Sequence, residues 1–227
     1  MADFPFDIVG LDLDGTLLET YRDLGTAVNH ALAAGGFATV SLEHARDLIG
    51  GGAKAMLQKA IAEQGGLDPD QFHGLYKKLL AFYGENYAVH TQPFPGTLEA
   101  LDDLAARGVR VAVVTNKFET FAVGILEALG MMDRFECVVG GDTLGKGKAK
   151  PEPDLLLEAQ RRCGGGRMAY AGDSSYDLRA ARKAGLPFVA ACYGYCDLDP
   201  AEMGETRIDS MGELVPALES LAPDATA

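Results

Sequence analysis

Two aspartates, Asp12 and Asp14, end a strongly apolar stretch near the start of the chain, in the sequence VGLDLDGTLLE. Burying one carboxylate is costly, and bringing a second one beside it adds like-charge repulsion. Two such charges about 4 Å apart repel by about 4 kcal/mol at an effective dielectric constant of 20. The pair therefore indicates a site that binds a cation or moves protons.

Further polar clusters lie next to predicted strands and helices. They are Thr115-Asn116, Lys150-Pro151 and the segment GDSSYD, which contains Asp173 and Asp177. Taken singly, Thr115 and Lys150 are well explained as turn residues. Taken together, the clusters supply several carboxylates, a lysine and a hydroxyl group. Oxygen ligands of this kind suit Mg²⁺, and a carboxylate-held metal beside a lysine and a threonine is typical of phosphoryl transfer.

The strands that must position these clusters are short apolar runs, at residues 6–11, 109–114, 137–139, 168–171 and 188–191. Helical patterns separate them, and this alternation predicts a Rossmann-like α/β fold, a parallel sheet with helices on both faces. The carboxyl ends of parallel strands share one edge of the sheet, where ligands bind. We therefore expect the polar clusters to converge at that edge.

The connection after the first strand is far longer than one crossover needs, since roughly a hundred residues separate Asp12 from the next strand. Its apolar residues follow helical spacing over 24–32, 56–61 and 72–83. We expect a helical-bundle cap at residues 18–91, inserted into a catalytic core of residues 1–17 and 92–227 and lying over the carboxyl edge of the sheet. The aromatic residues of its third helix are attributed to the bundle core.

Composition limits the partners and the location that we expect. The 227 residues carry a formal net charge of −13, which argues against nucleic acid and anionic membranes as partners. We see no signal peptide and no apolar run of membrane-spanning length, so we expect a cytoplasmic monomer or homodimer. The scattered cysteines indicate reduced thiols, and a metal site at Cys192 and Cys196 is disfavoured because no second ligand pair is present.

Four motifs, DLDGTL, VVTNK, KPEP and GDSSYD, resemble in their order those of the haloacid dehalogenase superfamily, and the helical insertion resembles its C1-type cap. The resemblance covers essentially the whole chain. It implies that Asp12 is the nucleophile and that Asp14 is the general acid and then the general base. It further implies Mg²⁺ held by Asp12, Asp173 and the main-chain carbonyl of Asp14, with Asp177 behind them or as an alternative ligand.

The same resemblance implies contacts with the phosphate. Thr115 would hydrogen-bond the transferring phosphoryl group, and Lys150 would neutralise it and hold the nucleophile. The substrate-binding residues expected in the core are Gly15, Thr16 and Asn116. The sequence KGKAKPEP leaves open whether Lys146 or Lys148 shares the role of Lys150.

Segments such as IGGGAKAML, PFPGTLEAL and CYGY resemble the bacterial phosphoglycolate phosphatases, although Glu19 stands where these usually have aspartate. This implies 2-phosphoglycolate as the substrate. In the cap, Gly50, Gly51 and Gly52 precede a predicted helix whose free amides attract anions, and Lys54 adds a positive charge. A substrate carboxylate would fit there, and a plain interhelical turn explains the glycines equally well.

Other functions remain open on this scaffold. A sugar-phosphate mutase is disfavoured, because Ile49 and Ala53 stand where mutases tend to carry basic residues. A phosphonoacetaldehyde hydrolase would need a cap lysine that forms a Schiff base, and Lys54 or Lys59 is available. Another small-metabolite phosphatase is a further alternative, whereas a non-catalytic binding protein would not need Asp14.

Overall fold

The computed structural model describes residues 4–49, 51–195, 197–199, 201 and 206–221. The chain divides into two compact units, one formed by Met1–Leu18 and Pro93–Ala227 and the other by Glu19–Gln92. The first unit contains the parallel sheet and the second contains a group of helices.

The first unit is built on a six-stranded sheet in the order β5-β4-β1-β6-β7-β8, and the neighbouring strands pair in parallel. The strands are β1 (Ile8–Leu11), β4 (Arg110–Val114), β5 (Cys137–Val139), β6 (Met168–Gly172), β7 (Phe188–Ala191) and β8 (Arg207–Ile208). The predicted parallel sheet is confirmed. The predicted carboxyl ends of its five strands agree with the structure to within one residue. The sequence did not predict β8, because two residues make too short a run to recognise.

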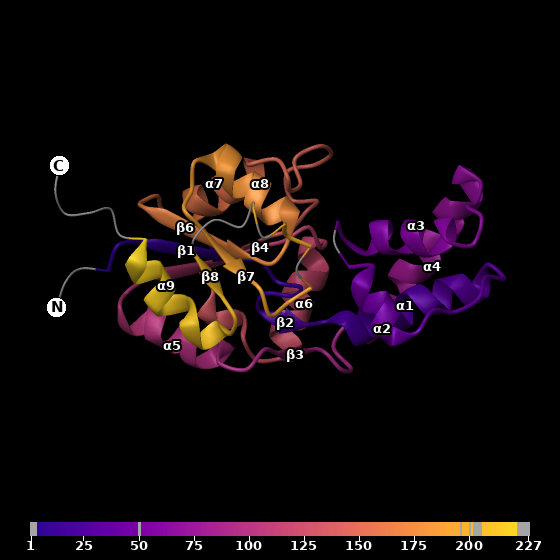
Figure 1. The fold of residues 1–227 in the computed structure, drawn as a ribbon, viewed down its shortest axis with the longest axis horizontal. Helices are drawn as coiled ribbons and strands as arrows, with labels where there is room; N and C mark the ends of the chain where they lie inside the picture. Colours follow the sequence, from indigo (N-terminus) through magenta and orange to yellow (C-terminus); the bar gives the residue numbers. More distant parts are fainter. Residues whose placement is uncertain (1–3, 50, 196, 200, 202–205, 222–227) are drawn as a thin grey trace. The chain divides into compact units, whose positions relative to one another are not determined.

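Helices cover both faces of the sheet. They are α5 (Thr97–Ala106), α6 (Glu119–Ala128), α7 (Asp154–Arg162), α8 (Ser175–Ala184) and α9 (Leu214–Ser220), with short 3-10 helices at Met132–Arg134 and Met211–Glu213. Helices α7 and α8 pack together on one face, and α5 and α9 pack together on the other (Figure 1). Strands β1 and β6 are buried along their whole length, which explains why they read as continuous apolar runs.

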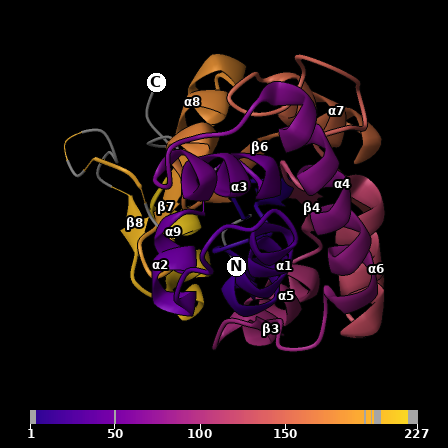
Figure 2. The same ribbon diagram turned by 90° about the vertical axis from the view of Figure 1, so that its right-hand side faces the viewer.

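The second unit consists of α1 (Tyr21–Ala34), α2 (Leu42–Asp47), α3 (Ala53–Ala62) and α4 (Pro69–Asn86) (Figure 2). Helix α1 packs against the other three. The three predicted helices are present, and α4 begins at Pro69 with the Asp68 side chain accepting the N–H of Asp70 at 2.9 Å. The sequence missed α2, which is only six residues long and begins at Ser41. Within the described ranges, no helix is both long and apolar enough to cross a membrane.

A two-stranded ribbon, β2 (Leu18–Glu19) with β3 (Gln92–Pro93), carries both passages of the chain between the units. Beside it, the buried carboxylate of Asp23 accepts the N–H groups of His90 and Thr91, each at 2.9 Å, and the hydroxyl of Thr91 at 2.8 Å. Because these donors satisfy the buried charge, the start of α1 is tied to the segment that leads back to the sheet.

Candidate active site

Three strands that are neighbours in the sheet each end in a buried polar residue. Asp12 follows β1, Thr115 follows β4 and Asp173 follows β6, and all three are at most 6% exposed. Strand β1 pairs with β4 on one side and with β6 on the other. The parallel order therefore brings residues that are more than a hundred positions apart in the sequence to one edge of the sheet.

Three carboxylates gather at this edge. Asp12, Asp173 and Asp177 each offer an oxygen, and these oxygens lie within 4.8 Å of one another. Burial raises the pKa of Asp12 to about 7, and it raises the pKa of Asp173 well above its usual range, with the neighbouring carboxylates adding to both shifts. A cluster of oxygen donors whose charges are disfavoured in this way fits a divalent metal ion.

Lys150 is fixed among these carboxylates. Its Nζ donates to Asp12 Oδ1 and to Asp177 Oδ1, each at 2.6 Å, and it lies 3.0 Å from the carbonyl of Val114 and 2.9 Å from the hydroxyl of Tyr170. Burial by itself lowers the pKa of this ammonium group, but Asp12 and Asp177 raise it above its usual value. Lys150 therefore stays charged although its side chain is 2% exposed.

Asp177 is held by protein donors on both carboxylate oxygens. Its Oδ1 accepts from Lys150 and from Tyr170 at 2.8 Å, and its Oδ2 accepts the N–H of Ser174 at 3.1 Å and the Ser174 hydroxyl. Ser174 and Asp177 form the capping box at the start of α8. A Cβ at Gly172 would lie 2.4 Å from Asp177 Cγ, so a glycine at the end of β6 is needed for this approach.

Asp14 has a buried partner that the sequence analysis did not assign. The Nζ of Lys117 donates to Asp14 Oδ1 at 2.7 Å, with the two side chains 5% and 18% exposed. The main-chain N–H of Lys117 also donates to the hydroxyl of Thr115 at 3.2 Å. Its position directly after Thr115-Asn116, at the end of a buried strand, was the signal that could have identified it.

The turn after Asp14 packs tightly against Asp173. Gly15 has a φ of 90°, and a Cβ on it would lie 2.1 Å from Asp173 Oδ2, so only glycine fits. Asp173 Oδ2 also accepts the N–H of Tyr195 at 2.8 Å, and the hydroxyl of Thr16 lies 3.5 Å from Asp173 Oδ1. The hydroxyl of Tyr193 donates to the carbonyl of Thr16 at 2.7 Å. The CYGY segment, which carried only a resemblance in the sequence, thus supports the turn.

The remaining predicted residues of the core are placed differently. The amide of Asn116 donates to the carbonyl of Lys150 at 3.0 Å, while its Oδ1 is buried without a partner among the residues that the structure describes. Lys146 is exposed, and Lys148 forms a surface ion pair with Asp154. Of the three lysines in KGKAKPEP, the structure brings Lys150 to the carboxylates.

Two of the predicted residues fall outside the described residues: Gly50 of the cap loop and Cys196 of the disfavoured cysteine pair. In the helical unit, Gly51 and Gly52 have φ values of 76° and 84°, and Gly52 immediately precedes α3. Both glycines therefore occupy the left-handed region, which other residues rarely adopt.

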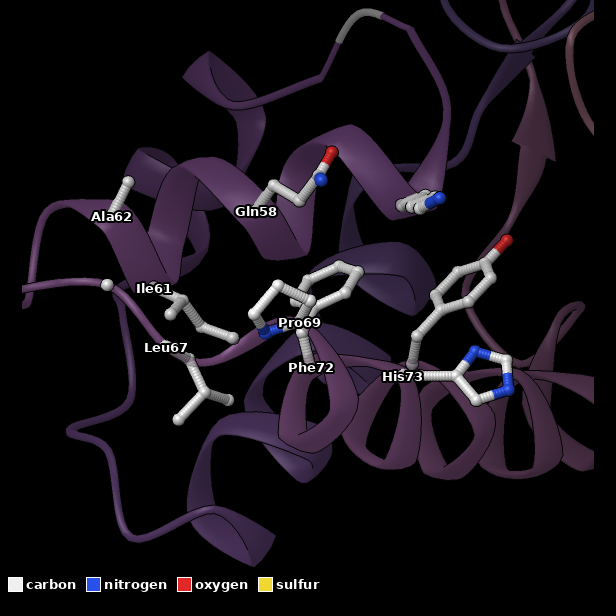
Figure 3. Close-up of a pocket in the computed structure, with 10 residues that line it drawn as sticks. Gln58, Ile61, Ala62, Leu67, Pro69, Phe72 and His73 are labelled. Carbon is white, nitrogen blue, oxygen red and sulfur yellow. The ribbon is translucent and has the colours of Figure 1, made fainter.

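A cavity of about 450 Å³ lies between α3 and α4 of the helical unit, and Lys54, Phe72, His73 and Tyr76 are among the residues that line it. Phe72 projects from α4 toward α3 (Figure 3). Phe72 and Tyr76 are only half-buried, so their assignment to the bundle core is wrong in part, whereas Tyr83 on the same helix is buried.

Comparison with known proteins places this site in context. The family model of haloacid dehalogenase-like hydrolases matches residues 9–191. A phosphoglycolate phosphatase of Agrobacterium fabrum is 36% identical over 91% of this chain and 90% of its own length. One of Nitrosospira multiformis is 39% identical over 84% and 85%. A crystal structure of a predicted phosphoglycolate phosphatase from Haemophilus somnus superposes with a TM-score of 0.84 and 30% identity, over 93% of this chain and 97% of that one.

Proposed function

The chain belongs to the haloacid dehalogenase-like hydrolases, and on this basis we propose that it hydrolyses 2-phosphoglycolate to glycolate and phosphate through an aspartyl-phosphate on Asp12. It is a phosphatase, and a small phosphorylated molecule is its substrate. The observation that carries the proposed mechanism is the buried position of Asp12, whose carboxylate lies 2.6 Å from Lys150 within the aspartate cluster.

In the proposed reaction, a carboxylate oxygen of Asp12 attacks the phosphorus, and the bond between phosphorus and the ester oxygen breaks. Asp14 gives its proton to that oxygen, so that glycolate leaves as an alcohol. Asp14 then takes a proton from a water molecule, whose oxygen attacks the aspartyl-phosphate and releases phosphate. The partial exposure of Asp14, at 18% of its side chain, is consistent with access for this water.

Lys150 and Thr115 have supporting roles in this mechanism. Lys150 holds Asp12 in position and neutralises charge on the phosphoryl group. Thr115, buried at the end of β4, contacts the same group through its hydroxyl. Asp177 keeps Lys150 in place from behind, since both of its oxygens already accept hydrogen bonds from the protein.

Mg²⁺ is the metal that we assign to the cluster, because hard oxygen donors suit it and phosphoryl transfer commonly employs it. Asp12 and Asp173 would hold the ion together with the main-chain carbonyl of Asp14. When bound, Mg²⁺ would neutralise negative charge on the phosphoryl oxygens. The closely packed turn at Gly15 supports the assignment, since it brings the backbone after Asp14 against Asp173.

The helical unit, Glu19–Gln92, is proposed to be the cap that confers substrate specificity. The positive φ values of Gly51 and Gly52 and the charge of Lys54 support a contact between this loop and an anionic group of the substrate. The net charge of −13 supports a small metabolite rather than nucleic acid as the partner.

A turnover screen tests the proposed function. Purified protein with Mg²⁺ is offered 2-phosphoglycolate, 2-hydroxyethyl phosphate, p-nitrophenyl phosphate, a sugar 1-phosphate and phosphonoacetaldehyde, and released phosphate or product is measured. We expect the highest kcat/KM with 2-phosphoglycolate. A higher value for any other compound in the panel would replace the proposed substrate, and mutase or phosphonate-cleaving activity would replace the proposed reaction.

A further inference from the structure

The partly buried contact between Lys117 and Asp14 places a positive charge beside the proposed general acid. Lys117 is in the core unit, directly after β4, and its Nζ lies 2.7 Å from Asp14 Oδ1. Only 5% of the Lys117 side chain is exposed. A charge excluded from water in this way interacts more strongly with a neighbouring anion than a surface lysine does.

The geometry of a general acid sets the distance between Lys117 and the leaving group. To protonate the ester oxygen, the carboxyl group of Asp14 must lie about 2.6–3.2 Å from it. Lys117 contacts the same carboxyl group, so its ammonium group is one carboxyl group away from the leaving oxygen. In 2-phosphoglycolate the carboxyl carbon is two bonds from that oxygen, about 2.4 Å at ordinary bond lengths.

The other buried lysine of the core, Lys150, is held by four neighbouring groups. Lys150 lies within hydrogen-bond distance of Asp12, Asp177, Val114 and Tyr170, on the side of the nucleophile. Lys150 is therefore placed to contact the phosphoryl group and not the leaving group. A carboxylate on the leaving group would also meet the negative charge of Asp12, and it therefore needs a cation of its own.

We infer that Lys117 is a specificity-determining residue that binds the carboxylate of the leaving group, and that it selects phosphate esters of small 2-hydroxy acids. This inference rests on the proposed function, because it assumes that Asp14 faces the ester oxygen of such a substrate. The carboxylate is thus assigned to a residue of the core, whereas the sequence predicted that the cap loop and Lys54 would bind it.

The test compares two substrates that differ in the carboxylate. Initial rates of Lys117→Met and Lys117→Arg are measured with 2-phosphoglycolate and with 2-hydroxyethyl phosphate, in which a hydroxymethyl group replaces the carboxylate. Lys183→Met removes a lysine from the same unit as a control, since Lys183 is 45% exposed and pairs with Glu152 on the surface. Lys54→Ala tests the cap lysine in parallel.

We expect Lys117→Met to lose about ten- to a hundredfold more kcat/KM with 2-phosphoglycolate than with 2-hydroxyethyl phosphate, the size of a lost charge-assisted hydrogen bond. Lys117→Arg should keep most of the preference, and the Lys183 control should keep all of it. Equal losses of Lys117→Met on both substrates would overturn the inference and leave Lys117 as a partner that only positions Asp14.

The proposed function and this inference can be refuted separately by the same measurements. If the unaltered protein does not prefer 2-phosphoglycolate over 2-hydroxyethyl phosphate, the proposed substrate is wrong whatever Lys117 does. If the unaltered protein has the preference and Lys54→Ala removes it while Lys117→Met retains it, the function stands and the carboxylate is bound by the cap. A variant that fails to fold would lose both activities, and Lys117→Arg then decides the outcome.

Discussion

Asp177 and Asp173 are two buried aspartates whose replacement by asparagine should have opposite effects on the stability of the metal-free protein. They are separated by four positions in the sequence, and both are at most 3% exposed. Asp177 accepts hydrogen bonds from Lys150, Tyr170 and Ser174. Asp173 has its pKa raised well above the usual range by burial and by neighbouring carboxylates. The same chemical change therefore removes a needed charge at one position and a disfavoured charge at the other.

For Asp177→Asn we expect a loss of about 3–5 kcal/mol in the free energy of unfolding, the cost of removing one partner from a buried ion pair. Lys150 would keep the carboxylate of Asp12, 2.6 Å away, as an ion-pair partner among the residues that the structure describes. The asparagine amide would also direct N–H groups toward either Tyr170 and Lys150 or Ser174, all of which donate in the native site. Part of the capping box at α8 would be lost as well.

For Asp173→Asn we expect an unchanged or increased free energy of unfolding without metal. A carboxyl whose folded-state pKa is raised destabilises the fold once the pH exceeds its unfolded pKa, about 3.9, because the fold disfavours the ionised form. A neutral amide removes this cost at neutral pH. The variant should, however, lose Mg²⁺ affinity, by about tenfold or more beyond any loss in Asp177→Asn, because a proposed ligand is gone.

The assay is urea unfolding of both variants in a chelator, followed by titration of the folded proteins with Mg²⁺ by calorimetry. The slope of the unfolding curve checks that the two variants expose the same surface. A stable Asp177→Asn protein with the larger loss of Mg²⁺ affinity would refute the reasoning, since it would identify Asp177 as a metal ligand. Equal destabilisation by both changes would show that Asp173 is also held mainly by structural contacts.

Four further predictions concern the metal, the catalytic pair, pH and the cap. A chelator should abolish turnover and Mg²⁺ should restore it, while Ca²⁺, with its looser coordination, should support it poorly; full activity in excess chelator would exclude a metal. Asp12→Asn should be inactive, whereas Asp14→Asn should still form a phosphoenzyme with p-nitrophenyl phosphate, whose leaving group needs little acid, and mass spectrometry should detect this adduct. Burial raises the pKa of Asp12 to about 7 in the metal-free protein, so protons compete with Mg²⁺ for this carboxylate below that pH. The Mg²⁺ affinity measured by calorimetry should therefore rise between about pH 6 and pH 8, and an affinity that does not change with pH would contradict this. Since Lys117 is assigned the substrate carboxylate, Gly51→Val and Lys54→Ala should lower kcat/KM for 2-phosphoglycolate and for p-nitrophenyl phosphate by similar factors, and a loss confined to 2-phosphoglycolate would show that the cap binds the carboxylate instead.

The sequence determined the sheet and the position of its reactive edge. Buried parallel strands are continuous apolar runs, so the ends of β1, β4 and β6 could be located to within one residue. Asp12, Thr115 and Asp173 follow these ends, and parallel pairing makes them neighbours whatever the details of packing. Glycine and Asp-Pro signals located helices of the second unit equally well, because local backbone preferences set where a helix begins and ends.

Short elements could not be read from the sequence. Strands β2, β3 and β8 have two residues each, and α2 has six, so none shows a full period of any pattern. The three short strands form because neighbouring strands satisfy their backbone groups. Such pairing depends on residues that are distant along the chain, as in the β2–β3 ribbon between Leu18 and Pro93.

Only the tertiary structure decided which side chains are partners within the site. Lys150, rather than Lys146 or Lys148, reaches Asp12, because the loop before α7 directs it into the buried edge while Lys148 pairs with Asp154 at the surface. The hydroxyl of Tyr170 contacts Lys150, although the strand that carries Tyr170 is buried along its length and consists otherwise of apolar residues and glycine. Lys117 meets Asp14 across a gap of 103 positions. Spacing along the chain predicts which residues share an edge of the sheet, but a hydrogen bond requires a particular distance and direction, and packing sets both.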